Sequence, residues 1–437
     1  MRILIVAAHY PPECNIASFR PYYWSLYWAH RGADVSVLTV DWKQKSDDLR
    51  LDNSHAAVIR VSNRFQDRMR RVFLGGEKAD RAIKDLSGHK TIVSSAKSMA
   101  ILFAKKYGVF CAQRWPDFFD AWARRAYAAV KDRYFDVVVT TAPPFAIHAV
   151  GKRYKKRFPN SIWIADWRDL WLDHPIYPGF PLFRPFERLL EKSVVTGADM
   201  NVFASRGMER KLRERYGDME STVIYNGYVG EPNVENRESE PVGMRNPIRV
   251  VYTGTIYPGI RDPSALFKAL KRVLPSMQKA RDDLEIIFAG SCEAVNDLAM
   301  KYGVEKYVSV LGRVGHTEAI ELQKSADVLL YIDCLTDSQT GVVGGKLFEY
   351  LICGKPIFCI NAPKNGEVAE IIATSNSGHV FYSDDLDGLE GFVRRLLEGD
   401  DVRMRINSEY VSAFSRESSA RKLYDGISQL MRSPQEL

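Results

Sequence analysis

A glycine pair followed by a lysine and a glutamate is the densest chemical signal in this 437-residue chain. It occupies residues 344–349 (GGKLFE) and indicates a glycine loop that opens a helix, with Lys346 and Glu349 one turn apart on the same face. The start of a helix offers free N–H groups and a positive dipole end, which suit a diphosphate. The Lys346 ammonium adds a point charge, and the Glu349 carboxylate can accept both hydroxyls of a ribose. The run predicts a nucleotide site, with a flexible turn before an ordinary surface ion pair as the alternative.

Charged residues also follow apolar runs in the first half of the chain. Asp166, Arg168 and Asp169 come directly after one such run, and His9 follows the first run of the sequence. Since ligands bind at the carboxyl ends of parallel strands, we expect these side chains to face a ligand. Asp166 and His9 are therefore the candidates for a general base. The alternative is a structural ion pair between Arg168 and Asp169 among buried tryptophans.

Strand and helix patterns alternate along the chain and must position these residues. Short apolar runs such as 3–8 and 248–252 indicate buried strands, and longer patterns such as 19–30 and 346–353 indicate helices. This alternation predicts parallel sheets with helices on both faces. We therefore expect the α/β class, with two Rossmann-like doubly wound parallel-sheet domains facing across a cleft that holds the ligand.

A change of composition near the middle of the chain indicates where the two domains separate. Residues 229–246 are rich in Gly, Pro, Asn and Glu and lack apolar periodicity, which is typical of a linker. We expect a first domain at residues 1–228 and a second at residues 247–414. The length of the chain also suits two domains better than one hydrophobic core.

Composition excludes several classes of protein. The six cysteines form no Cys-x-x-Cys pair and no zinc-type cluster with histidine, so we expect reduced thiols and no metal site. No run approaches the roughly 18 apolar residues of a membrane span, and the first apolar run is too short for a signal peptide. We therefore expect a cytoplasmic protein, and peripheral binding at the inner face of the plasma membrane remains open.

The net charge of +7 is concentrated in the first half of the chain. Basic clusters occupy residues 64–71, 152–157 and 206–215. Such clusters suit anionic lipid head groups or phosphorylated substrates, with solvated helix surface as the alternative. No helix-turn-helix, zinc-finger or RNP motif is present, so we do not expect nucleic acid as a partner.

The run at 344–351, followed by Gly354-Lys355-Pro356, resembles the donor-binding motif of GT-B glycosyltransferases, in particular family 4. Further segments resemble the same family in the same order, and the resemblance covers most of the chain. They are Ala165–Trp171, Asn226-Gly227, Thr253-Gly254-Thr255, Gly312-Arg313-Val314 and Phe414-Ser415-Arg416. The last of these implies a C-terminal helix at 415–433 that crosses back onto the first domain.

The resemblance implies a hexosyl-type glycosyltransferase of surface polysaccharide or lipopolysaccharide synthesis. A UDP- or GDP-sugar is the expected co-substrate, a glycan or polyprenyl-diphosphate-linked glycan is the expected acceptor, and no cofactor or metal is required. Retention of the anomeric configuration is implied, and an inverting reaction would use Asp166 or His9 as base. Lys346 takes a catalytic role beside these two residues. Donor binding is assigned to Gly254, Arg261, Arg313, Thr340, Gly344, Gly345, Lys346 and Glu349.

The sequence departs from the family pattern at two positions. Gly341 stands where the family has the first of two glutamates, so the sugar must be held by other groups such as Thr340. Thr255 stands where an arginine is common, which leaves Arg261 as the second phosphate-binding cation. Two alternatives stay open, a nucleotide-sugar 2-epimerase of the same fold and a non-catalytic GT-B partner protein. An NAD-dependent dehydrogenase is disfavoured, since no Gly-x-Gly-x-x-Gly follows the first strand.

Overall fold

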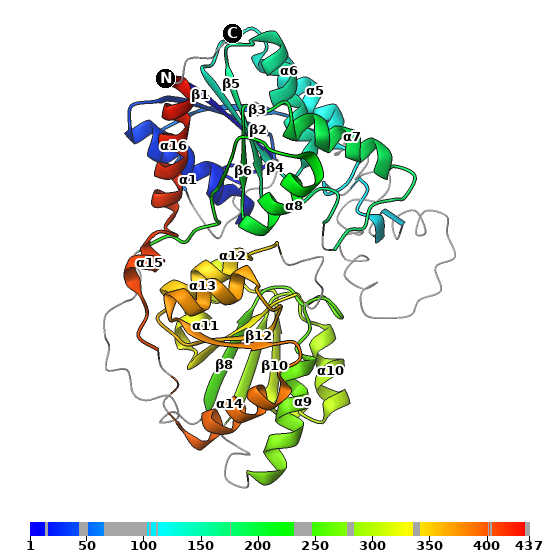
Figure 1. Cartoon of the computed structure of the whole chain (residues 1–437), viewed down its shortest axis with the longest axis vertical. Coiled ribbons are helices and arrows are strands. Elements are labelled where there is room, and N and C mark those ends of the chain that lie inside the picture. Colours follow the sequence, from blue (N-terminus) through cyan, green and yellow to red (C-terminus); the bar gives the residue numbers. More distant parts are fainter. Residues whose placement is uncertain are drawn as a thin grey trace. The chain divides into compact units, whose positions relative to one another are not determined.

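In a computed structural model, the chain forms two compact units (Figure 1). The first unit comprises Met1–Tyr225 with Ser419–Leu437, and the second comprises Asn226–Ser418. Of the expected linker at 229–246, residues 231–246 lie outside the described part of the chain. The structure describes residues 1–13, 16–42, 51–64, 103–104, 106–110, 112–174, 176–230, 247–277, 284–334, 341–400, 402 and 404–432.

The first unit contains a seven-stranded parallel sheet in the order β3-β2-β1-β4-β5-β6-β7. Ile5 at its centre pairs with Val37 on one side and with Val139 on the other. The strands are β1 (Arg2–Ala7), β2 (Asp34–Val40), β3 (Ala57–Val61), β4 (Val137–Ala142), β5 (Ile162–Trp167), β6 (Met200–Phe203) and β7 (Ser221–Val223).

Helices cover both faces of this sheet because side chains alternate along each strand. Ile3 and Ile5 belong to a core that includes Trp28 of α1 and Leu423 of α16, whereas Leu4 packs into the opposite core with α5 and α6. The indole of Trp28 donates to the carbonyl of Ala420 at 2.9 Å, which fixes α16 to α1. The helices are α1 (Ile16–His30), α5 (Phe119–Val130), α6 (His148–Arg157), α7 (Arg184–Val195), α8 (Arg206–Tyr216) and α16 (Arg416–Arg432).

The second unit contains a six-stranded parallel sheet in the order β10-β9-β8-β11-β12-β13. Its strands are β8 (Ile248–Thr253), β9 (Leu284–Ala289), β10 (Val308–Gly312), β11 (Val328–Ile332), β12 (Ile357–Ala362) and β13 (Gly378–Tyr382). Its helices are α9 (Ser264–Val273), α10 (Ala294–Tyr302), α11 (His316–Ser325), α12 (Gly345–Ile352), α13 (Glu367–Ser375), α14 (Leu386–Glu398) and α15 (Ser408–Ser412).

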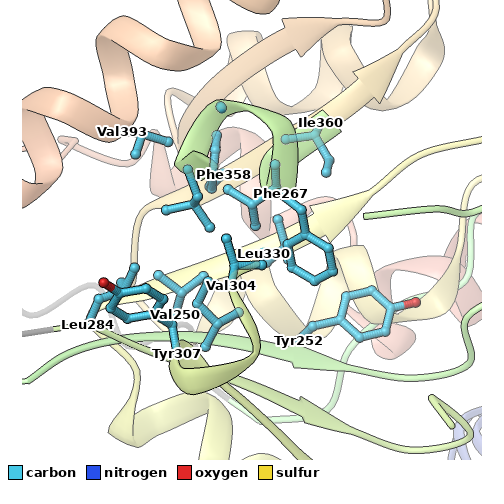
Figure 2. Close-up of a cluster of buried hydrophobic side chains, with 14 of the residues drawn as sticks. Val250, Tyr252, Phe267, Leu284, Val304, Tyr307, Leu330, Phe358, Ile360 and Val393 are labelled. Carbon is cyan, nitrogen blue, oxygen red and sulfur yellow. The ribbon is translucent and has the colours of Figure 1, made fainter. Parts of the chain in front are cut away.

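One hydrophobic core of the second unit lies between the sheet and helices α9, α10 and α14 (Figure 2). Val250, Leu330 and Phe358 of the strands pack there against Phe267 of α9 and Val393 of α14. Helices α11, α12 and α13 lie on the other side of the sheet (Figure 1). This second layer carries Lys346 and Glu349 on α12.

Strand order reverses once in each sheet, between β1 and β4 in the first unit and between β8 and β11 in the second. In doubly wound sheets the ligand crevice forms at this reversal, beyond the carboxyl ends of the strands. The expected α/β class with two Rossmann-like parallel sheets is confirmed. In each unit, a ligand site is therefore expected at the carboxyl ends of the strands beside the reversal.

Candidate functional site

Glycines in left-handed conformations end three neighbouring strands of the second unit. Gly254, Gly290 and Gly312 have φ values of +139°, +132° and +75°. The N–H of Gly254 donates to Ala289 at 2.7 Å, and the N–H of Gly290 donates to Gly312 at 2.6 Å. A Cβ at Gly290 would lie 1.9 Å from the carbonyl oxygen of Gly254, so only glycine fits there. The sheet edge is therefore bare backbone that a ligand can approach closely.

The ammonium of Lys346 reaches this edge from the first turn of α12. It donates to the hydroxyl of Tyr252 at 2.8 Å, and it occupies the space that a Cβ at Gly254 would fill, 2.1 Å away. The Tyr252 hydroxyl in turn donates to the carbonyl of Thr255 at 2.9 Å. Burial lowers the pKa of Lys346 well below its usual value, and the nearby positive charge of Arg261 lowers it further. A bound anion would reverse this penalty on the charged form.

Arg261 is the second cation at the β8–β11 reversal. Its Nη2 lies 3.7 Å from the sulfur of Cys334, which follows β11. Its Nε is buried and has no hydrogen-bond partner in the described part of the chain. The nearby carboxyl of Asp333 is buried, which raises its pKa to about 6, so below that pH it does not offset the charge of Arg261. The two cations thus leave room for a ligand that brings negative charge.

A buried glutamine holds Glu349 beside the strand end. The side-chain amide of Gln323, on α11, donates to Thr253 Oγ1 at 3.0 Å and to Glu349 Oε2 at 3.4 Å. The Tyr350 hydroxyl accepts the N–H of Thr253 at 2.9 Å, which ties α12 to β8. Sequence reasoning missed Gln323, because one polar residue on an amphipathic helix gives no signal of burial.

The other predicted donor residues take different places around this edge. Arg313 is exposed and donates to Ser291 Oγ at 3.0 Å, just beyond the ends of β9 and β10. Gly344 is the extended residue before α12, and a Cβ built at Gly345 meets no atom within 4 Å. Thr340 lies outside the described residues. The structure thus gathers Gly254, Arg261 and Lys346, with Glu349 one turn along the same helix.

His9 lies at the end of β1 in the first unit, next to the reversal of strand order. Its ring stacks on Trp42 with a centroid separation of 5.1 Å and an interplanar angle of 5°. Its Nδ1 lies 2.9 Å from a carboxylate oxygen of Glu13. A carboxylate at Nδ1 favours the tautomer with the proton there, which leaves the lone pair on Nε2. This arrangement suits an oriented general base, and the sequence pattern gave no sign of Glu13 or Trp42 as its partners.

Asp166, the other predicted base, lies in a closed polar cluster at the end of β5. It is fully buried, and its carboxylate accepts from Arg20 at 2.8 Å and from Thr141 at 2.6 Å. Arg20 also donates to the carbonyl of Ile224 at 2.8 Å. These contacts join α1, β4 and β5 to the end of β7, and they occupy the buried carboxylate of Asp166. Of the two predicted bases, the geometry favours His9.

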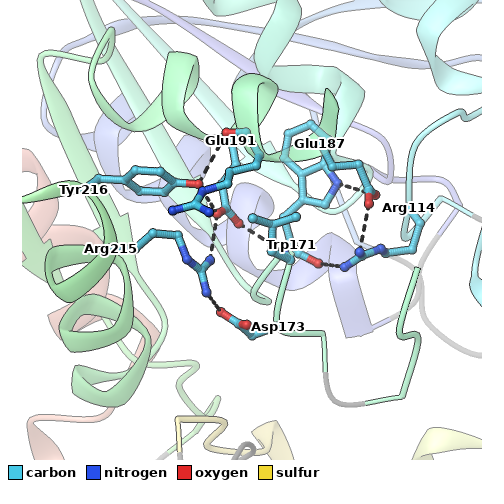
Figure 3. Close-up of polar contacts among 9 residues, drawn as sticks. Arg114, Trp171, Asp173, Glu187, Glu191, Arg215 and Tyr216 are labelled. Atoms are coloured by element: carbon cyan, nitrogen blue, oxygen red, sulfur yellow. Dashed lines mark hydrogen bonds and ion pairs between the residues drawn. The ribbon is translucent and has the colours of Figure 1, made fainter. Parts of the chain in front are cut away.

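Arg168 and the segment after β5 are held by separate contacts. Arg168 donates to the carbonyls of Ala17, Ala142 and Pro143, so it connects strand ends to α1 and does not pair with Asp169. Two glutamates of α7 hold the part of this segment around Trp171 (Figure 3). Glu191 accepts the N–H of Leu172 at 3.1 Å, and Arg114, paired with Glu187, donates to the carbonyl of Trp171.

The described part of the chain lacks two further features. No helix there is both long enough and apolar enough to span a membrane. No cluster of three or more His, Cys, Asp or Glu side chains there is arranged to hold a metal ion.

Part of the second unit resembles a known protein family. Residues 247–399 match the family model described as Glycosyl transferases group 1. This match spans the strand ends, α11 and α12 that carry the cationic site. No curated protein sequence matches the chain significantly.

Solved structures resemble the whole chain at low sequence identity. Sucrose-phosphate synthase from Thermosynechococcus elongatus is 16% identical, with a TM-score of 0.61 over 98% of this chain and 99% of that one. The lipopolysaccharide outer core galactosyltransferase WaaB is 12% identical, with a TM-score of 0.59 over 98% and 100%. A trehalose-6-phosphate protein from E. coli, bound with UDP-2-fluoro glucose, is 11% identical, with a TM-score of 0.61 over 98% and 99%. At these identities the likeness establishes the fold, which is GT-B.

Proposed function

We propose that this protein is a glycosyltransferase. Residues 247–399 match the model of the glycosyl transferases group 1 family, and the chain has the GT-B fold. Its donor would be a nucleoside-diphosphate sugar, and its product a new glycosidic bond on a glycan or lipid-linked acceptor. From the sequence resemblance, we further propose that the transferred sugar is a hexosyl group and that the protein acts in cell-surface polysaccharide synthesis.

One observation carries the proposal more than any other, which is the pair of cations at the β8–β11 reversal. Lys346 is held by the neutral hydroxyl of Tyr252, and Arg261 keeps a buried Nε without a partner in the described part of the chain. Two neighbouring cations of this kind suit the diphosphate of the donor. Glu349 would accept the ribose hydroxyls one turn further along α12.

The same cations would assist the chemical step. The bond between the anomeric carbon and the diphosphate oxygen breaks as the acceptor oxygen forms the new glycosidic bond. Negative charge then develops on the leaving diphosphate, and preorganised cations stabilise that charge. In a retaining reaction the leaving phosphate accepts the acceptor proton. In an inverting reaction His9, oriented by Glu13, would accept it instead.

The acceptor and its location belong to the proposal as well. We expect a glycan or a polyprenyl-diphosphate-linked glycan, reached at the cytoplasmic face of the plasma membrane. Support comes from the exposed cations of α6, where Lys152, Lys156 and Arg157 remain at the surface while Lys155 pairs with Asp199 at 2.8 Å. Of the predicted cluster at 64–71, only Arg64 lies within the described residues.

The proposal is tested by incubating the protein with a panel of UDP- and GDP-sugars and measuring release of nucleoside diphosphate, with and without glycan and lipid-linked acceptors. A transferase releases the nucleoside diphosphate faster with one acceptor, and NMR of the product gives the anomeric configuration. Epimerisation of the donor sugar without any acceptor would favour the 2-epimerase. Donor binding without turnover on any acceptor would favour the non-catalytic partner protein.

A further inference from the structure

Helix α7 in the first unit has an inverted distribution of polar and apolar side chains. Its glutamates, Glu187 and Glu191, are fully buried. Its large apolar residues face outward, and Phe186 and Leu189 are 55% and 67% exposed. A helix that packs on a sheet normally buries its apolar stripe and exposes its charges. The reversal indicates that the outer face of α7 serves another purpose.

The buried face of α7 is committed to a polar network (Figure 3). Glu187 pairs with Arg114 at 2.8 Å, with both side chains fully buried. Glu191 accepts from Arg215 at 2.9 Å and from the hydroxyl of Tyr216 at 2.7 Å. These contacts fix the rotation of α7 about its axis. A rotation that turned its leucines inward would break these buried ion pairs, which is strongly destabilising.

Aromatic side chains continue the apolar surface beyond the start of α7. Phe186 lies 5.9 Å from Trp115 between ring centroids, and Trp115 lies 5.4 Å from Phe183. Phe183 lies 5.4 Å from Phe180, which lies 5.0 Å from Phe103. The exposed members of this surface, called here the α7 patch, are Phe103, Leu182, Phe186, Leu189 and Leu190.

Positive charges border the α7 patch, and exposed negative charges of α7 are absent. Arg184, Arg188 and Lys192 are exposed on the helix at intervals of four residues. Both glutamates of this helix are buried and paired, so its exposed surface carries cations only. The arginines of α8 differ, because Arg213 pairs with Glu209 at 3.2 Å. The cations of α7 therefore differ from the predicted cluster on α8, whose charge is partly offset within the helix.

We propose that the α7 patch docks the protein on a lipid bilayer with anionic head groups. An outward face of leucine and phenylalanine beside a row of cations suits a helix lying in the plane of the interface. Aromatic rings are favoured at the same depth. A continuous apolar surface of this kind is unusual on a monomer with no partner. Docking there rests on the proposed function only in that it would bring the enzyme to a lipid-linked acceptor, and binding to the bilayer does not itself require sugar transfer.

Co-sedimentation of the full chain with vesicles tests the proposal. Vesicles of phosphatidylcholine alone are compared with an equal mixture of phosphatidylcholine and phosphatidylglycerol, with no nucleotide or acceptor present. We expect strong binding to the anionic vesicles and weak binding to the neutral ones. Arg184→Gln/Arg188→Gln/Lys192→Gln should weaken anionic binding on the order of 100-fold, since each cation contributes about fivefold. Phe186→Ser/Leu189→Ser should weaken it about tenfold or more for each side chain removed from the interface.

Matched variants in the second unit provide the controls. Met300 and Leu311 are 59% and 49% exposed, so Met300→Ser/Leu311→Ser matches the apolar change. Lys268→Gln/Lys271→Gln/Lys301→Gln removes three exposed cations elsewhere. Both controls should bind vesicles as the unmodified protein does. Equal loss in the controls, or equal binding to neutral and anionic vesicles, would overturn the proposal. So would self-association in sedimentation velocity that only the Phe186/Leu189 variant abolishes, because the patch would then be a protein interface.

Discussion

The ammonium of Lys346 lies 2.8 Å from the hydroxyl oxygen of Tyr252 and 4.1 Å from the centroid of its ring. Within the described residues, no carboxylate forms an ion pair with this lysine. A neutral hydroxyl and an aromatic face hold the cation in place without cancelling its charge. An anionic ligand at the glycine-lined end of β8 would therefore meet no competing carboxylate, and it would favour the charged form of Lys346.

Replacing Gly254 should disturb the lysine directly. In Gly254→Ala the new Cβ would fall 2.1 Å from Lys346 Nζ, and the backbone would keep a φ of +139° that alanine disfavours. We expect nucleotide affinity to fall about tenfold or more, as one charge-assisted contact is lost. Gly391→Ala on α14, where a Cβ meets open space, is the control. It should leave affinity unchanged, and equal affinities for all three proteins in calorimetry would contradict the placement of Lys346.

Glu349 and its neighbour Gln323 should matter for the nucleoside but not for the diphosphate. Glu349→Gln and Gln323→Leu each remove part of the contact at 3.4 Å that orients the carboxylate. We expect about a tenfold loss of affinity for a nucleoside diphosphate, since hydrogen bonds to a charged group are worth roughly 1.5–3 kcal/mol. Binding of inorganic diphosphate should not change. A parallel loss for both ligands would show that Glu349 does not contact the ribose.

Asp166 should prove to be a stability residue. Asp166→Asn breaks a fully buried ion pair with Arg20, which typically costs about 3–5 kcal/mol of unfolding free energy. Urea denaturation of the protein measures this loss. Glu321→Gln, which breaks an exposed pair with Lys324, should cost less than about 1 kcal/mol. An unchanged denaturation midpoint with lost turnover would instead return Asp166 to the role of base.

The donor affinity should depend on pH through Asp333. Burial raises the pKa of this carboxyl from 3.8 to about 6. Below that pH the group is neutral and the charge of Arg261 is fully available, so affinity for a nucleotide sugar should rise as pH falls through 6. The same shift makes folding stability fall as pH rises from about 4 to about 6, because the folded state favours the protonated form.

Calorimetric titration on either side of this pKa measures the effect. A nucleotide sugar is the ligand of choice, because its diphosphate is esterified at both ends and does not titrate in this range. Asp333→Asn should remove most of the pH dependence. An unaltered profile in that variant would assign the titration to another group.

Local sequence patterns predicted those parts of the site that are formed by residues adjacent in the sequence. The glycine pair and Lys346 start α12 because glycine and the following apolar face specify a loop and a helix together. The strand ends were predicted for the same reason, since short apolar runs bounded by glycine specify buried strands. Tyr252 and Gln323 were missed because their roles come from contacts across the sheet.

Long-range contacts also determine the surroundings of residues that local sequence patterns could not describe. Asp166 lies at the end of a strand, as a catalytic acid often does, but its partner Arg20 is 146 positions away in the sequence. The glutamates of α7 are spaced like a surface charge pattern, yet Arg114 and Arg215 bury them. Their burial forces Phe186 and Leu189 outward, so helical periodicity alone assigns the wrong face to the core.

Nucleotide binding by the unmodified protein and by Lys346→Met tests the central claim most directly. Thermal shift is measured with UDP, GDP, CMP, ADP and NAD, and Lys324→Met, which removes a surface lysine that is 59% exposed, is the matched control. A ligand at 100 times its dissociation constant adds about 2.7 kcal/mol of stability. We predict a shift with UDP or GDP that persists in the control and is lost in Lys346→Met. No shift with any nucleoside diphosphate, or a shift with NAD alone, would contradict the account.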